Sequence, residues 1–119
     1  MTSQIKLYHK KSNALIAEHV KVADNFFSRA LGLMGKKSIE KKSALWVKNC
    51  THIHTFFMRM SIDLIFVDKN LHVERIYANA KPWRHFFTGS WSADSVFELP
   101  VGTLKDLTID VGDELYVGS

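Results

Sequence analysis

An almost unbroken apolar run from Ile62 to Val67 is the feature that most constrains the fold of this chain. The turn residues Asp68-Lys69-Asn70 follow it directly, and a second segment rich in Ile, Val and Tyr extends from Leu71 to Ala78. A short apolar run bounded by turn residues is typical of a strand that is covered on both faces. We therefore expect a β-hairpin whose first strand lies inside the core.

Several other segments also predict strands. Gln4 to His9 and Leu15 to Val22 alternate apolar and polar residues around a polar turn, which is the pattern of an opening hairpin. The segment from Cys50 to Val67 predicts one long strand or two consecutive strands with a bend near Ser61. Further strands are expected at Ser43 to Lys48, Val96 to Leu99 and Glu114 to Val117.

Two short helices are expected between these strands. Over 24–34, an N-cap at Asp24 precedes apolar residues at the three-and-four spacing of one helix face. Thr103 with Asp106 predicts a variant capping box for a second helix. With many short strands and no βαβ rhythm, the predicted class is α+β and mostly antiparallel β, as a curled sheet or partly closed barrel with two short helices.

Length and composition limit the domain organisation and the compartment. With 119 residues, 46% of them hydrophobic, the chain predicts a single domain over 1–119. It contains no apolar run long enough to span a membrane and no secretory signal, so a cytoplasmic location is expected, or an extracytoplasmic one if a leader has been removed. The lone cysteine, Cys50, excludes an internal disulfide. The oligomeric state is not predicted.

Basic residues are concentrated in the first part of the chain. Residues 1–48 hold ten Lys/Arg against three Asp/Glu, and the densest segment carries Lys36, Lys37, Lys41 and Lys42. Such a segment attracts phosphate at moderate salt, but no aromatic stacking residues accompany these lysines. We therefore predict a solvated loop and do not favour nucleic acid as a partner. Trp83, Phe86, Phe87 and Trp91 crowd a different segment, 81–92, which we expect to be irregular and folded back on the protein.

Cys50, His52 and His54 would share one face of an extended strand. A Cys50–His54 pair for nucleophilic catalysis requires a turn, because a straight strand would separate the two residues by roughly 13 Å. His52 and His54 are candidate metal ligands, but a zinc site needs a further ligand at a recognised spacing. No metal site is predicted, and a thiol held in the structure remains the alternative for Cys50.

Two carboxylates lie within apolar runs. Asp63 is flanked by Ile62 and Leu64, where a carboxylate is costly unless it is satisfied. It is either a general base with a raised pKa or a structural group that accepts backbone N–H bonds or pairs with an arginine, and we favour the structural pair. Glu98, between Phe97 and Leu99, has the same two interpretations, with a solvent-facing strand position as the simplest.

Ordered motifs along the chain resemble the family of small bacterial and archaeal proteins called domain of unknown function 192. The matching residues are Arg29 with Gly32-Leu33-Met34, Phe57-Met58-Arg59, Ile62-Asp63, Lys81-Pro82-Trp83-Arg84, Glu98 to Thr103, and Gly112-Asp113. The resemblance covers about residues 23–117. Ser61 stands where members usually have proline, and Val101 replaces the usual alanine. The resemblance implies a compact, mostly β fold, but it implies no established reaction.

The leading functional hypothesis is a ligand-binding or accessory module with a polar and aromatic pocket, for an unknown small molecule or protein. Its predicted ligand-binding residues are Arg29, His54, Arg59, Asp63, Arg84 and Glu98. The alternative is a hydrolytic or metal-assisted enzyme that uses His54 and Asp63 with Cys50 or His52. The chain contains no phosphate-binding loop, dinucleotide fingerprint or metalloprotease motif, so no cofactor is assigned.

Overall fold

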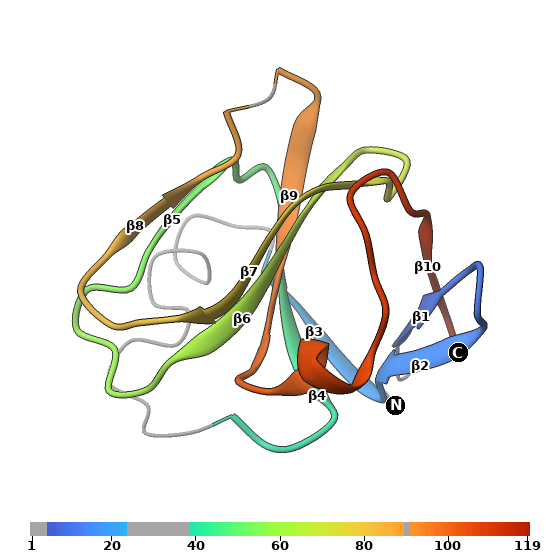
Figure 1. The fold of residues 1–119 in the computed structure, drawn as a ribbon, viewed down its shortest axis with the longest axis horizontal. Helices are drawn as coiled ribbons and strands as arrows, with labels where there is room; N and C mark the ends of the chain where they lie inside the picture. Colours follow the sequence, from blue (N-terminus) through green and yellow to red (C-terminus); the bar gives the residue numbers. More distant parts are fainter. Residues whose placement is uncertain (1–4, 24–38, 90) are drawn as a thin grey trace.

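The structure, a computed structural model, describes residues 5–23, 39–89 and 91–119. These residues form three sheets (Figure 1). The described part of the chain contains ten strands and one 3-10 turn. Their bounds are β1 Lys6–His9, β2 Ala14–Ala17, β3 His19–Ala23, β4 Ser43–Val47, β5 His52–His54, β6 Ile62–Asp68, β7 Val73–Ala80, β8 His85–Phe87, β9 Ala93–Pro100, η1 Thr103–Asp106 and β10 Leu115–Gly118.

The central sheet has five strands in the order β3-β4-β9-β6-β7. Its neighbouring strands are antiparallel except for β3 and β4, which run parallel. A three-stranded sheet, β10-β1-β2, and a two-stranded ribbon, β5-β8, complete the described structure. The predicted hairpin at the Asp68-Lys69-Asn70 turn is present as β6 and β7.

The α+β class is wrong, because the described residues are all β and contain no α-helix. The expected helix at Thr103 is the single 3-10 turn η1, in which Thr103 donates its hydroxyl hydrogen back to the Pro100 carbonyl instead of capping a helix. The expected helix at 24–34 lies outside the described residues. The barrel expectation is also wrong, since the sheets remain separate and do not close.

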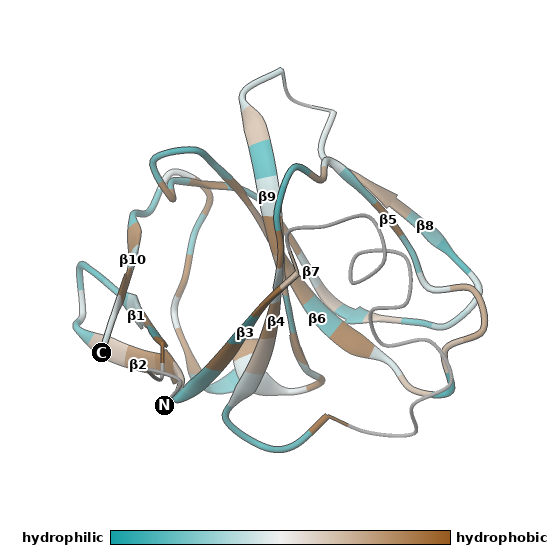
Figure 2. Cartoon of the chain, turned by 180° about the vertical axis from the view of Figure 1, so that it is seen from behind, coloured by the Kyte–Doolittle hydropathy of each residue, from teal (hydrophilic) through white to brown (hydrophobic). Residues whose placement is uncertain are grey.

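The central sheet is covered on both faces, as the apolar run of β6 requires. Ile65 and Val67 pack in one cluster with Leu7 and Leu115 of the three-stranded sheet. The alternate residues of β6 pack in a second cluster with Ile53 of β5. Figure 2 shows hydrophobic residues along the central strands where they cross, and both hydrophilic and hydrophobic residues on β5 and β8 at the edge. Each large apolar side chain buried in this way contributes roughly 1.5–3 kcal/mol.

Several expected segments differ from the observed strands. The segment from Leu15 to Val22, expected as one strand, is divided between β2 and β3 in different sheets. The segment from Cys50 to Val67 forms two strands, β5 and β6, that belong to different sheets. The segment expected to be irregular, 81–92, contains β8, which pairs with β5. Among the described residues, no helix is long and apolar enough to cross a membrane.

Candidate functional site

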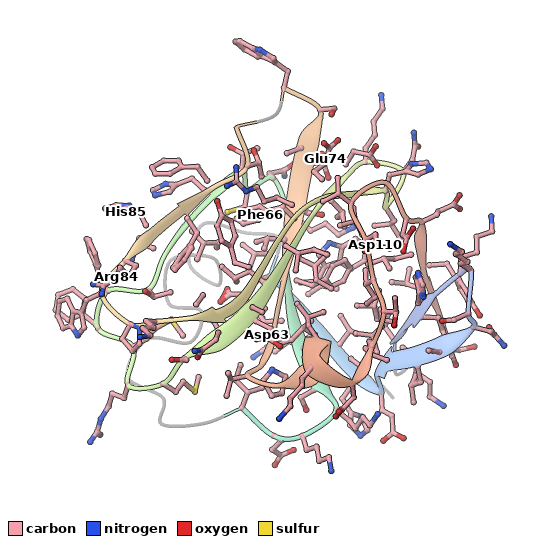
Figure 3. All side chains as sticks on the ribbon, in the orientation of Figure 1. Asp63, Phe66, Glu74, Arg84, His85 and Asp110 are labelled. Carbon is pink, nitrogen blue, oxygen red and sulfur yellow. The ribbon has the colours of Figure 1, made fainter. Side chains whose placement is uncertain are left out.

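The two faces of the β5-β8 ribbon have different surroundings. Ile53 and Phe86 are register partners on the inner face, and both pack against the second core cluster. The residues on either side of them are exposed to solvent, because side chains alternate across a strand. The ribbon therefore has an apolar underside and an open outer face at the edge of the molecule, where Figure 3 labels His85 and Arg84.

Seven rings form a continuous chain of contacts over this outer face and the two adjoining turns. We call them the aromatic–histidine face: His52, His54, Phe56, Phe57, Trp83, His85 and Phe87. Neighbouring ring centroids along the chain lie 4.5 Å apart for His52 and Phe87 and 5.9 Å apart for Phe56 and Trp83. Phe57, Trp83 and Phe87 remain 58%, 56% and 55% exposed. The rings thus contact one another, while much of their surface remains exposed to solvent.

An imidazole pair lies at the centre of this face. Nε2 of His52 and Nδ1 of His85 are 2.7 Å apart, within hydrogen-bond distance. One of these nitrogens has to donate and the other has to accept, so the bond requires at least one neutral ring. Burial, followed by the charges of His85 and His54, lowers the pKa of His52 below its ordinary value. A neutral His52 at pH 7 therefore agrees with the observed hydrogen bond.

Two of the exposed rings are carried on left-handed backbone. Phe57 has φ 65° and Trp83 has φ 63°, and their ring centroids are 4.9 Å apart. Bulky residues rarely adopt this conformation, which costs roughly 1–2 kcal/mol per residue. Strained backbone of this kind is concentrated at functional sites, where the surrounding structure holds it in place.

Thr55 holds the two strained turns together. Its hydroxyl donates to the Lys81 carbonyl at 2.6 Å and accepts from the Arg84 N–H at 2.9 Å. Its own N–H donates to the Arg84 carbonyl, and its carbonyl accepts from the Trp83 N–H. Thr55 is fully buried, so this single side chain fixes the backbone on which Trp83 is presented.

Replacing Thr55 with valine should lower the free energy of unfolding by about 2 kcal/mol, because the Arg84 N–H loses its acceptor and the Lys81 carbonyl loses its donor. Chemical denaturation measures this change, and hydrogen exchange at the Arg84 amide should accelerate. Thr55→Ser keeps the hydroxyl and is the matched control. Equal stability of the valine and serine variants would contradict the anchoring role.

Asp63 lies on the opposite face of the central sheet from the ribbon. Its register partner on β9 is Leu99, a member of the core cluster that faces the three-stranded sheet. One carboxylate oxygen accepts the Asn79 N–H at 2.8 Å, and the other accepts the Leu104 N–H at 2.9 Å. Asp63 is 1% exposed. The sequence left three roles open for Asp63: a general base, an acceptor of backbone N–H bonds and a partner of an arginine. In the structure its carboxylate accepts backbone N–H bonds.

Glu98 faces the ribbon side of the sheet, between its register partners Leu45 and Leu64. The solvent-facing position expected for it is wrong, since it is only 5% exposed. Burial raises the pKa of Glu98 from 4.5 to about 7. Among the described residues, no hydrogen bond to its carboxyl group is present. Asp63 and Glu98 are therefore not brought together, because the sheet lies between them.

The other predicted site residues are distributed unevenly. His54 belongs to the aromatic–histidine face, and Arg59 and Arg84 are exposed on the turns beside it. Arg29 lies outside the described residues. The Cys50 thiol donates a hydrogen bond to the His52 carbonyl at 3.0 Å. No group of three His, Cys, Asp or Glu side chains in the described ranges is arranged to hold a metal ion.

A polar cluster that the sequence did not reveal connects β1 to the segment before β10. His9 contacts the Ser12 hydroxyl through Nδ1 at 2.7 Å and the Asp113 carboxylate through Nε2 at 2.8 Å. The Asp110 N–H and then the His9 hydrogen bond lower the pKa of Asp113. The closing Gly112-Asp113 motif was the only sequence signal, and it does not identify His9 as the partner.

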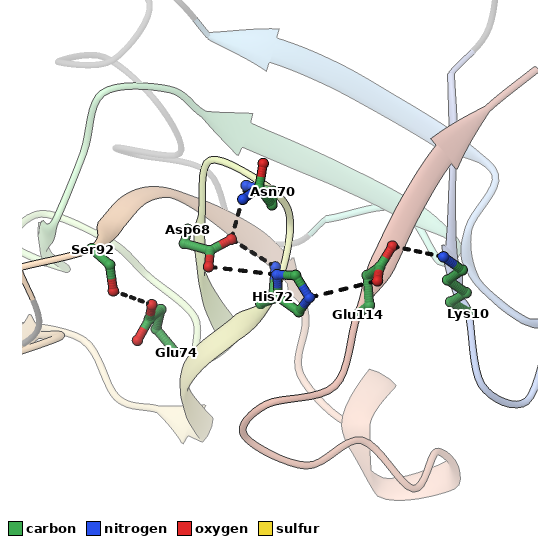
Figure 4. Close-up of polar contacts among 7 residues, drawn as sticks. All are labelled: Lys10, Asp68, Asn70, His72, Glu74, Ser92 and Glu114. Carbon is green, nitrogen blue, oxygen red and sulfur yellow. Dashed lines mark hydrogen bonds and ion pairs between the residues drawn. The ribbon is translucent and has the colours of Figure 1, made fainter.

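A second polar chain crosses the same end of the molecule (Figure 4). Asp68 and His72 approach at 3.6 Å, His72 and Glu114 at 3.5 Å, and Glu114 and Lys10 at 2.9 Å. These contacts connect the β6–β7 turn to the residue before β10 and to the β1–β2 turn. Since the groups are at least partly exposed, each pair is worth about 0–1 kcal/mol, and we assign the chain a structural role.

Comparison with known proteins gives matches over nearly the whole chain. Residues 7–117 match the model of the family DUF192, described as "Uncharacterized ACR". A UPF0127 protein of Thermococcus sibiricus is 34% identical over 113 residues, which are 92% of this chain and 72% of the relative. The UPF0127 protein PF1050 of Pyrococcus furiosus is 36% identical over 99 residues, which are 81% of this chain and 84% of the relative.

Two crystal structures resemble this one in fold. A protein of Sinorhizobium meliloti, described as a proposed transcription regulator, has a TM-score of 0.77 and 22% identity over 95% of this chain and 91% of its own. A protein of unknown function from Novosphingobium aromaticivorans has a TM-score of 0.78 and 19% identity over 94% of this chain and 82% of its own. At these identities the likeness concerns the fold alone.

Proposed function

The chain belongs to the uncharacterised DUF192 family, as its motifs predicted, and from its geometry we propose that it is a ligand-binding module whose contact surface is the aromatic–histidine face. The observation that carries the proposal is the pair of exposed rings on strained backbone. Phe57 and Trp83 each adopt left-handed φ, and each leaves more than half of its surface open to solvent. Neither burial of the ring nor backbone preference accounts for this arrangement, whereas contact with a ligand does.

The chemistry of this face favours a flat, anionic ligand. Flat groups stack on open aromatic rings. Residues 51–61 and 81–89 contain Arg59, Lys81 and Arg84 together with three histidines, but no Asp or Glu. All three cationic side chains are exposed. A surface that combines stacking rings with positive charge attracts an aromatic phosphate or carboxylate more than a neutral sugar.

The enzyme alternative has less support. Both carboxylate oxygens of Asp63 already accept backbone N–H groups, and the side chain is buried on the far face of the sheet from His54. A general base has to reach the proton that it removes. The Cys50 thiol donates to a backbone carbonyl, and His52 bonds His85. Neither arrangement supports the nucleophile and base that this alternative requires.

Titration with adenosine 5′-monophosphate tests the binding proposal. We expect chemical-shift changes in the backbone amides of His52 to Phe57 and Trp83 to Phe87. A dissociation constant on the order of 1 mM is expected, because it corresponds to about 4 kcal/mol, the sum of one stacked base at about 1–3 kcal/mol and a phosphate contact. Glucose is the neutral control and should produce no shifts.

The variant for this titration is Trp83→Asn, because asparagine tolerates left-handed backbone and the fold should be retained. It should weaken nucleotide binding by roughly fivefold or more. Trp91→Ser removes a fully exposed tryptophan outside the face and should leave binding unchanged. Shifts that map elsewhere, or that persist in the Trp83 variant, would rule out this surface.

A further inference from the structure

Stacking rings and cationic side chains occur together at the β5-β8 ribbon and not at the lysine-rich segment. Lys41 and Lys42 are exposed, but no aromatic ring contact involves the described part of their segment. The ribbon, by contrast, combines its seven-ring face with Arg59, Lys81 and Arg84. Resting on the binding function proposed above, we propose that the aromatic–histidine face binds single-stranded nucleic acid.

The rings are arranged to contact more than one base. Phe87 lies at one end of the contact chain, stacked on His52, and Phe57 lies at the other end beyond Trp83. Both ends are more than half exposed, so bases can stack at separate points of one surface. Proteins that bind single strands without sequence preference use such platforms, because every base has a flat face to present.

The backbone that carries two of these rings is already fixed. Trp83 and Arg84 donate their backbone N–H groups to Thr55, so the turn does not have to be ordered when a ligand binds. Preorganisation of this kind lowers the entropic cost of association. It also holds the exposed side chains of Lys81 and Arg84 close to Trp83, where they can contact the phosphates that flank a stacked base.

The charge pattern favours a polyanion over a single phosphate. Three exposed cationic side chains lie within two residues of Phe57 or Trp83 in the chain, and the two ribbon segments carry no carboxylate that would repel phosphate. If the three cationic side chains neutralise three phosphates of a single-stranded nucleic acid, a plot of log K against log salt should have a slope of about −2. Each phosphate contact contributes about 0.7 to this slope. A duplex hides the faces of its bases, so it meets the cations but loses the stacking.

Fluorescence anisotropy with labelled 15-nucleotide oligo(dT) and oligo(U) tests the inference at 50 and 200 mM salt. We expect roughly tenfold tighter binding of the single strands than of a duplex of equal length, and the salt slope given above. Lys81→Gln combined with Arg84→Gln should reduce the slope by about 1.4, because two phosphate contacts are lost. Trp83→Asn should weaken binding by roughly tenfold and leave the slope unchanged.

The matched controls are Trp91→Ser and the double variant Lys41→Gln/Lys42→Gln, neither of which should change the affinity by more than about twofold. Thermal unfolding of each variant identifies any loss of fold. Equal affinity for single strand and duplex, or binding abolished by the Lys41/Lys42 variant alone, would overturn the inference. If adenosine 5′-monophosphate binds the face as tightly as the oligonucleotides do, the inference fails but the binding proposal stands. If neither adenosine 5′-monophosphate nor the oligonucleotides bind this face, both the inference and the binding proposal fail.

Discussion

Replacing Glu98 with glutamine is expected to raise the free energy of unfolding at pH 8 by about 3 kcal/mol. In the native protein, Glu98 is buried between Leu45 and Leu64, and burial raises its pKa from 4.5 to about 7. Glutamine has nearly the same shape but never carries the charge whose burial is costly. At pH 8 the variant should also unfold roughly 10 °C higher than the native protein.

The pH dependence follows from the direction of this shift. Below pH 4.5, Glu98 is protonated in both the folded and the unfolded chain, so it carries no penalty. Between pH 4.5 and about 7, the unfolded chain releases the proton while the folded chain retains it, and stability therefore falls as the pH rises. Above pH 7 the loss is complete.

Denaturant unfolding at pH 4.5, 6 and 8 measures the difference between native protein and Glu98→Gln. The difference should be small at pH 4.5 and largest at pH 8. Glu18→Gln is the matched control, because Glu18 is exposed and its replacement should show no such trend. A constant difference across the pH range would mean that Glu98 is not a buried titrating carboxyl group.

Replacing Asp63 with asparagine is expected to lower the free energy of unfolding by about 2–4 kcal/mol. The native carboxylate accepts the Asn79 N–H on one oxygen and the Leu104 N–H on the other. An asparagine side chain has a single acceptor oxygen, and its NH₂ group would face the second N–H donor. One buried donor would then lose its partner, either on β7 or on η1.

Asp68→Asn supplies the control, because Asp68 also accepts two backbone N–H groups, those of Asn70 and His72, but accepts both on Oδ1, which the single amide oxygen of asparagine can replace. It lies in a half-buried turn where water can replace a lost bond, so the cost should stay near 1 kcal/mol. Urea denaturation of both variants gives the comparison. If the two substitutions cost the same, the use of both buried carboxylate oxygens of Asp63 is not what makes its hydrogen bonds important.

Local patterns predicted the central hairpin well. The apolar run of β6 and the turn that follows it contain their own signals, since side-chain periodicity and turn chemistry act over a few residues. The expected helix at Thr103 was wrong for a tertiary reason. Its hydroxyl donates to the Pro100 carbonyl instead of accepting an N–H group of the following turn, and the Leu104 N–H donates to Asp63, forty-one positions away in the chain.

The candidate site was likewise predicted where local patterns sufficed and was wrong where tertiary contacts decided. The sequence identified His54, Arg59 and Arg84, because polar residues among aromatics stand out in one dimension. It grouped them with Asp63 and Glu98, which lie on opposite faces of the central sheet. It drew attention to the aromatic residues of segment 81–92 but expected that segment to be irregular. It therefore missed the strand β8, because the pairing of His85 to Phe87 with β5 joins segments about thirty residues apart.

The family membership and the existence of a buried β6 strand were contained in the sequence, because motifs and local periodicity are properties of neighbouring residues. Only the tertiary structure decided which face each carboxylate occupies, that seven rings form one surface, and that Thr55 holds Trp83 on strained backbone. Those features depend on strand register and long-range hydrogen bonds, in which a shift of a single residue would move every side chain to the other face.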